Sequence, residues 1–251
     1  MKIPFCLVLI LSLNTFAQNK NIDLSFDDES YETIWDVEKE NLLSPFTTPA
    51  VWILGGGTLI TYYLYQEKKK RGKIGFQEDH NEVQRGTWQY YGNIIGWAAL
   101  QGVYTLTQLP GIYRGEQRAI ENTEIMWKST IYTSLTTGAM KLLIREQRQD
   151  SVKRYESFPS GHASAAFAFA TNLAIRHEWY WSVLAAPFVL AASTSRVSTD
   201  SHYAHDAVFG AALGISFAYG MNYVSKKRDV PFILGYEPME DGGGLHLKYR
   251  F

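Results

Sequence analysis

Most of the chain consists of long stretches without Asp, Glu, Lys or Arg, separated by short charged segments. Six such stretches cover residues 49–66, 86–113, 129–140, 157–175, 179–195 and 207–225. They are rich in Ala, Gly, Ser and Thr, and small residues such as Gly210 and Gly214 let neighbouring helices approach closely. The pattern predicts an all-α, up-and-down bundle of about six helices.

The length of these stretches suits a membrane. Five of the six are long enough to cross a hydrocarbon layer, which takes about 20 residues, while stretch 129–140 would need Lys128 and Lys141 to snorkel. The mean hydropathy of −0.18 is low for six spans, and helices buried in a large soluble bundle are also apolar all round. We therefore expect a membrane-embedded bundle and keep a soluble bundle as the alternative.

The first residues resemble an export signal. Lys2 precedes an almost unbroken apolar run, and residues 15–17 form a small-x-small cleavage pattern, which together predict a signal peptide over 1–18. Its removal would also remove Cys6, the single cysteine, so we expect neither a disulfide framework nor a cysteine-based zinc site. The following segment 19–48 is acidic and predicts a solvated arm or a short surface helix.

The C-terminal tail 229–251 differs from the helical region 49–228. Apolar residues from Leu245 to Phe251 alternate strictly with polar ones and follow three consecutive glycines, so we expect a short β-hairpin with a glycine-rich turn. The whole chain is 46% hydrophobic, which excludes a disordered protein. Its net charge of −1 gives no basic field for binding nucleic acid.

Polar clusters stand at the ends of the uncharged stretches. Lys141 and Arg148 are seven residues apart and would share one helix face, although basic residues are common at helix ends without any ligand. Ser160, Gly161 and His162 stand near the start of the fourth stretch. Ser160 would cap a helix whose exposed N–H groups bind an anion, with His162 as a proton donor; an ordinary capped helix is the alternative.

A third cluster lies between the last two stretches. His202 and Asp206 are four residues apart and would stack on one helix face. The carboxylate would then fix the imidazole tautomer and leave the other nitrogen free as a nucleophile, and Arg196 adds a bidentate phosphate donor. A helix-capping Asp beside a surface His is the alternative.

An up-and-down bundle brings these three clusters to one end of the molecule. Three cations, a helix N-terminus and two histidines suit phosphoryl transfer, which needs positive charge around the phosphate oxygens, an in-line nucleophile and an acid for the leaving group. Because three side-chain cations supply the charge, we expect no metal ion or other cofactor.

The clusters at 141–148, 159–162 and 195–206 together resemble the three-part signature of the type 2 phosphatidic acid phosphatase family, which includes bacterial class A acid phosphatases and vanadium haloperoxidases. The resemblance implies that His202 attacks phosphorus to form a phosphohistidine and that Asp206 orients it. It implies that His162 protonates the leaving oxygen and later activates water. The residues that it implies for holding the phosphate are Lys141, Arg148, Ser160, Gly161 and Arg196.

Two neighbouring positions differ from what the family usually carries. Gln149 replaces the proline that usually follows the first-cluster arginine, a change that bears on the loop geometry and not on the charge. His205 stands where lipid phosphatases often have a small residue or proline. We interpret His205 as peripheral to the site, and a residue that tunes the pocket is the alternative.

The expected function is a metal-independent phosphatase of the cell envelope, acting on a lipid-linked phosphate monoester or pyrophosphate. A basic loop at 68–73 on the same side would attract anionic headgroups or mark the cytoplasmic side. We favour a site that faces the periplasm. The alternatives are a soluble periplasmic acid phosphatase, a vanadate-dependent haloperoxidase and a non-catalytic membrane protein.

Overall fold

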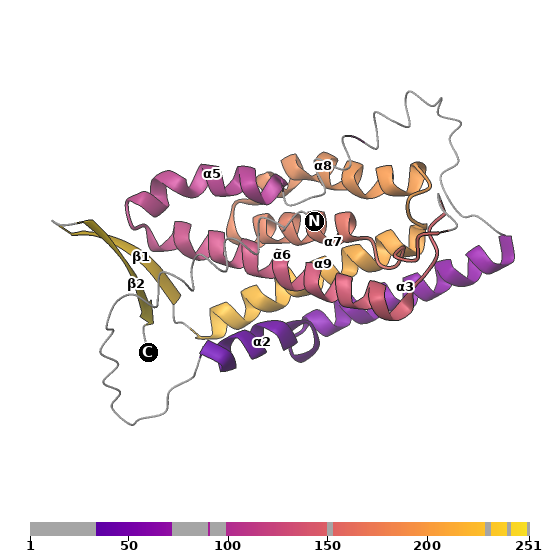
Figure 1. The fold of residues 1–251 in the computed structure, drawn as a ribbon, viewed down its shortest axis with the longest axis horizontal. Helices are drawn as coiled ribbons and strands as arrows, with labels where there is room; N and C mark the ends of the chain where they lie inside the picture. Colours follow the sequence, from indigo (N-terminus) through magenta and orange to yellow (C-terminus); the bar gives the residue numbers. More distant parts are fainter. Residues whose placement is uncertain are drawn as a thin grey trace. The chain divides into compact units, whose positions relative to one another are not determined.

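The structure is a computed structural model that describes residues 34–71, 90, 99–149, 153–228, 232–239 and 242–249. Within them the helical region is all-α, as predicted (Figure 1). The predicted signal peptide 1–18 and the first part of the acidic arm lie outside the described residues. The helices are α2 (Ile34–Thr47), α3 (Ala50–Arg71), α5 (Leu100–Tyr113), α6 (Gln117–Ile144), α7 (Gly161–Arg176), α8 (Trp179–Ser198) and α9 (Ala204–Arg228).

Several helix boundaries differ from the sequence prediction, which gave about six helices where seven are described. Helix α2 lies in the expected arm, and α6 starts well before the uncharged stretch 129–140. Charged residues fit inside α6 because they find partners: the ammonium of Lys128 lies 2.6 Å from Glu124 and 2.6 Å from Glu38 of α2. The basic run expected as a loop is, over residues 68–71, the end of α3.

Helix α9 is packed against α3, α6, α7 and α8. Phe217, in the middle of α9, is 1% exposed. Two glycines allow α7 to lie close: a Cβ on Gly210 would be 2.5 Å from the carbonyl oxygen of Ser160, and one on Gly214 would be 2.1 Å from that of Ser164. The close helix approach predicted for these glycines is confirmed.

The segments that carry the three polar clusters meet at one end of the helices. The N–H of Ser160, before α7, donates to the carbonyl of Asp206 in α9 at 3.0 Å. The N–H of His202 donates to the carbonyl of Arg196 in α8 at 2.9 Å. The side-chain amide of Gln149, after α6, donates to the carbonyl of His202 at 2.9 Å. These contacts join the end of α6, the start of α7, the end of α8 and the start of α9.

Two antiparallel strands, β1 (Phe232–Met239) and β2 (Gly242–Tyr249), lie near the end of the chain. Their register pairs Met239 with Gly242 and Phe232 with Tyr249. The three glycines expected to form the turn are therefore part of β2, and that detail of the prediction is wrong.

Only one helix in the described part of the chain, over Ala204–Lys227 of α9, is long and apolar enough to cross a membrane. In the window that qualifies, 72% is buried, as in the core helix of a soluble protein. The expectation of five membrane-length helices is thus wrong for the described residues; α5 and α7, for example, have 14 and 16 residues. Large apolar side chains are nevertheless exposed on five of the described helices, α2, α3, α5, α6 and α8, among them Leu59 (72%), Leu106 (64%) and Trp179 (72%).

Candidate active site

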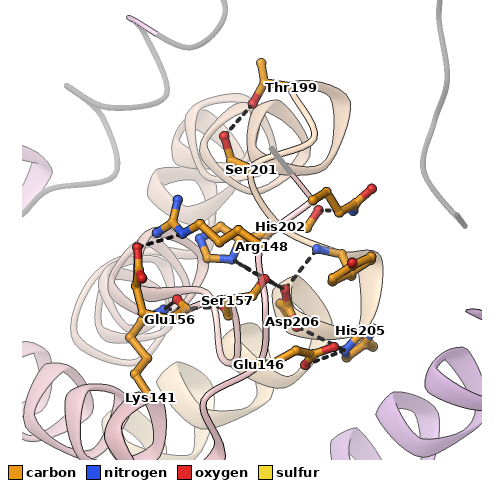
Figure 2. Close-up of polar contacts among 12 residues, drawn as sticks. Lys141, Glu146, Arg148, Glu156, Ser157, Thr199, Ser201, His202, His205 and Asp206 are labelled. Carbon is orange, nitrogen blue, oxygen red and sulfur yellow. Dashed lines mark hydrogen bonds and ion pairs between the residues drawn. The ribbon is translucent and has the colours of Figure 1, made fainter. Parts of the chain in front are cut away.

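His202 and Asp206 form a buried pair at the start of α9 (Figure 2). Nδ1 of His202 lies 3.4 Å from Oδ2 of Asp206, and the side chains are 1% and 0% exposed. Oδ2 also accepts hydrogen bonds from the N–H of Tyr203, at 2.9 Å, and from the hydroxyl of Ser157. Because Nδ1 faces the carboxylate, Nε2 of His202 is the nitrogen left for a ligand. Burial lowers the pKa of His202, which favours a neutral imidazole.

The pair is formed by a turn and not by the helix face that the spacing predicted. Helix α9 begins at Ala204, so His202 precedes its first residue. Asp200 supports the tight turn with a left-handed φ of 56°, a conformation that Asp tolerates better than most residues. The turn brings His202 back to the last residues of α8.

The cationic side chains come from separate segments. Arg196 is in the last turn of α8 and is 5% exposed. Lys141 is in the last turn of α6, where its ammonium donates to the backbone carbonyls of Glu156 and Ser157. Burial, assisted by the charge of Arg148, lowers the pKa of Lys141 to about 8.

Arg148 reaches the site from coil and not from a helix face shared with Lys141. Helix α6 ends at Ile144, and Arg145 has a left-handed φ of 52°, so that part of the prediction is wrong. Arg148 nevertheless lies close enough to His202 for its charge to lower the pKa of that imidazole, and Figure 2 draws it among the site residues. Its Nε lies 3.1 Å from a carboxylate oxygen of Glu156, so this arginine already binds an anionic group.

The start of α7 presents polar atoms without partners. Ser160 has the extended backbone of an N-cap residue, but its hydroxyl makes no capping hydrogen bond, contrary to the prediction. Among the described residues, this hydroxyl and Nε2 of His162 are buried and have no hydrogen-bond partner. Burial, with the charge of Arg196 adding to it, lowers the pKa of His162 to about 3. A phosphate at this helix start would also meet the free N–H groups that follow Gly161.

Sequence reasoning missed two residues that hold the His202–Asp206 pair. Ser157 donates its hydroxyl to Asp206, and Gln149 holds the backbone carbonyl of His202. Gln149 could have been noticed in the sequence, because it replaces the proline that the family usually has at this position. Its side-chain amide donates a hydrogen bond that a proline side chain cannot make. Ser157 carried no signal of its own in the sequence.

His205 is not peripheral, and that interpretation is wrong. It is 2% exposed, and its Nε2 lies 3.0 Å from Oε2 of Glu146 and 3.1 Å from Oδ1 of Asp206. These three side chains could offer ligand atoms to a metal ion, since the atoms lie within 4.8 Å of one another. The N···O separations of 3.0 and 3.1 Å are those of hydrogen bonds. The ammonium of Lys68 also pairs with Glu146, which favours a proton-linked network.

A family model for the PAP2 superfamily matches residues 117–229. This region is a PAP2 superfamily domain. It starts at the first residue of α6 and ends just after α9, so these four helices and their connections make up the PAP2 domain. Members of the superfamily are typically phosphatases, and membership implies a phosphatase-type activity without specifying the substrate. No curated protein and no solved structure matches the chain.

Proposed function

We propose that the PAP2 domain hydrolyses phosphate monoesters or pyrophosphates through a phosphohistidine at His202, without a metal ion. The observation that carries the proposal is the buried His202–Asp206 pair, 3.4 Å apart, beside cationic side chains and the unpartnered atoms of Ser160 and His162. A phosphate group bound there would satisfy those atoms and offset the buried positive charge.

In the first step, Nε2 of His202 attacks phosphorus and forms a P–N bond while the bond to the leaving oxygen breaks. His162 gives a proton to that leaving oxygen. The imidazole of His202 becomes positive, and Asp206 stabilises this charge. Lys141 and the two arginines offset the charge on the equatorial phosphate oxygens, a role that other enzymes give to Mg²⁺.

In the second step, water attacks phosphorus and the P–N bond breaks. His162, which lost its proton in the first step, takes a proton from the water. His202 leaves as a neutral imidazole, and inorganic phosphate is released. The two histidines thus return to their starting states in one cycle.

His162 has to be protonated to act as an acid, although its pKa is about 3 in the ligand-free site. Part of this lowering comes from the positive charge of Arg196 and its neighbours. A bound phosphate dianion would offset that charge and raise the pKa of His162. Substrate binding would therefore supply the proton that the first step uses.

We propose a lipid-linked phosphate as the substrate, at a membrane-associated site that faces the periplasm. The apolar side chains exposed on α3, α5 and α8 support a surface that contacts lipid. A soluble periplasmic acid phosphatase is the second candidate. It is favoured by the finding that α9, the one membrane-length helix in the described residues, is largely buried.

Phosphate release tests both candidates. Purified protein with EDTA present is assayed on lipid-linked and soluble phosphate monoesters and pyrophosphates. We expect release by the wild-type protein and a loss of at least about 1000-fold in His202→Ala, because the nucleophile is removed. His177→Asn is the matched control: this histidine follows the far end of α7, about 22 Å from His162 by helical rise, and its variant should stay active.

The outcomes separate the candidates. Faster release from lipid-linked substrates, with protein that stays in the membrane pellet after a carbonate wash, supports the lipid phosphatase. Equal rates on soluble substrates and protein in the supernatant support the soluble enzyme. An active His202→Ala variant, or a wild-type protein that releases no phosphate, contradicts the proposed reaction.

A further inference from the structure

We propose that His205 and Glu146 are positioning residues of this reaction, and that they act on His202 through Asp206. The inference rests on the proposed function. It concerns the side of Asp206 that faces away from His202, where His205 was interpreted as peripheral.

His205 lies between two carboxylates. Its Nε2 lies 3.1 and 3.0 Å from the two carboxylate oxygens of Glu146 and 3.1 Å from Oδ1 of Asp206, and Figure 2 marks contacts of His205 with both residues. Ionised carboxylates can only accept hydrogen bonds, so Nε2 must carry the proton. His205 thus donates this N–H to Glu146, and the same nitrogen also lies 3.1 Å from Oδ1 of Asp206, the carboxylate oxygen that His202 does not use.

The ring of His205 is held from three sides. It stacks on Tyr203, with centroids 5.4 Å apart and planes at 17°, and on Phe158, at 5.9 Å and 24°. The edge of Tyr65, from α3, meets it at 5.4 Å and 78°. With three aromatic neighbours and 2% exposure, the imidazole has little freedom to rotate.

Glu146 is held in turn by α3. The ammonium of Lys68 forms an ion pair with Oε1 of Glu146, and it lies 3.2 Å from the centroid of the Tyr203 ring. The side chains form a continuous chain of contacts that runs from Lys68 through Glu146, His205 and Asp206 to His202. Helix α3 lies outside the matched PAP2 region, so this support is added to the four-helix domain from another part of the chain.

The geometry of these side-chain contacts lets them position the carboxylate of Asp206 and, through it, the ring of His202. Oδ2 of Asp206 accepts from Tyr203 and Ser157 and faces His202, whereas Oδ1 makes no hydrogen bond of good geometry among the described residues. His205 is the group that faces Oδ1. The two hydrogen bonds to Oδ2 and the close contact of the protonated Nε2 of His205 with Oδ1 together restrict the carboxylate plane, and with it the Nδ1–H tautomer of His202.

Two substitutions of His205 test the proposal. His205→Gln keeps an N–H donor near the position of Nε2, whereas His205→Leu fills a similar volume without one. We expect kcat of His205→Leu to fall about 10- to 100-fold with KM within about 3-fold, the range seen when an outer hydrogen-bond partner is lost. His205→Gln should recover most of kcat. The ¹⁵N NMR shifts of the His202 ring should show an Nδ1–H tautomer in the wild type and the Gln variant, and a mixture in the Leu variant.

A purely structural role of His205 would change stability but not these readings. A folded His205→Leu protein with wild-type kcat and an unchanged His202 tautomer would overturn the proposal. If His205→Leu does not fold, Glu146→Gln decides by the same two measurements: we expect a several-fold loss of kcat, and no change in either reading overturns the proposal. Activity that EDTA removes and a divalent cation restores would overturn it in favour of a metal site.

The failure of this inference and that of the proposed function are distinguishable. A wild-type protein without phosphatase activity refutes the proposed function and this role with it. An active wild-type protein that loses activity in His202→Ala, but keeps it in His205→Leu, refutes the role of His205 alone.

Discussion

At the scale of single residues, burial decides the protonation of the site. Burial lowers the pKa of His162 to about 3, and it lowers the pKa of His202 in the same direction. Both imidazoles are therefore neutral at pH 7 without substrate. For His202 this is the state of a nucleophile, and for His162 it means that the proton has to arrive with the phosphate.

Acid should destabilise the folded protein because of His162. Below pH 6.5 the histidine of the unfolded chain binds a proton, while the folded one stays neutral until about pH 3. The unfolded state thus binds more protons, and the free energy of unfolding should fall with decreasing pH between these values. Denaturant titrations at pH 7, 6, 5 and 4 should show a fall that is steeper in the wild type than in His162→Gln, by at most about 1.4 kcal/mol per pH unit. Parallel curves would contradict the buried, neutral state of His162.

The residues of the candidate site could be predicted only where a local motif carried them. Lys141, His162 and His202 stand in short patterns at the ends of uncharged stretches, so a bundle topology was enough to bring them together. The partners across the site were not predictable in this way. Glu146 and His205 are 59 residues apart, and neither stretch of sequence indicates the other.

At the scale of elements, the contact between α7 and α9 sets the position of the site. Helix α7 begins directly after Ser160, whose N–H bonds the carbonyl of Asp206 in α9. The two helices lie so close that a Cβ on Gly214 would be 2.1 Å from the carbonyl of Ser164. A change in their spacing would move the anion-binding end of α7 relative to His202.

Gly214→Ala should therefore lower both stability and activity. The added methyl group meets backbone atoms, which cannot yield like a flexible side chain, and overpacking of this kind costs about 1–3 kcal/mol of unfolding free energy. Gly138→Ala, in α6, is the matched control because its Cβ would have no atom within 4 Å. It should be neutral or stabilising by up to about 1 kcal/mol, since alanine favours the helix. Equal denaturation midpoints for the two variants would contradict the packing described for α7 and α9.

Helix boundaries were predictable where a helix consists mainly of uncharged residues and unpredictable where it pairs charges. The uncharged stretches coincide closely with α9, which is largely buried, and with α8, which exposes large apolar side chains such as Trp179 and Leu184. They fail for α2 and the first half of α6, which are joined by the contact of Lys128 with Glu38. Absence of charge marks a helix whose apolar side chains are either buried or exposed, and it does not report on helices whose charges are neutralised by neighbours.

At the scale of the whole molecule, the PAP2 domain of α6–α9 contains every residue proposed to touch the phosphate. Helix α3, outside that region, adds Lys68 and Tyr65 to the support of the site. The exposed apolar side chains on α3, α5 and α8 add a surface that suits lipid. The sequence predicted the bundle and the end at which the site lies, but it overestimated how many helices have membrane length.

The central claim is a covalent phosphohistidine at His202, and trapping it is the most direct test. The protein is mixed with p-nitrophenyl phosphate, quenched within milliseconds and analysed by peptide mass spectrometry under alkaline conditions. His162→Ala should accumulate the intermediate. The p-nitrophenolate group leaves without an acid, so the phosphohistidine still forms, but its hydrolysis still needs a base to activate water. We predict one phosphoryl group on His202, more of it in His162→Ala, and none in His202→Ala. Phosphate release without label on His202, or label on another residue, would contradict the account.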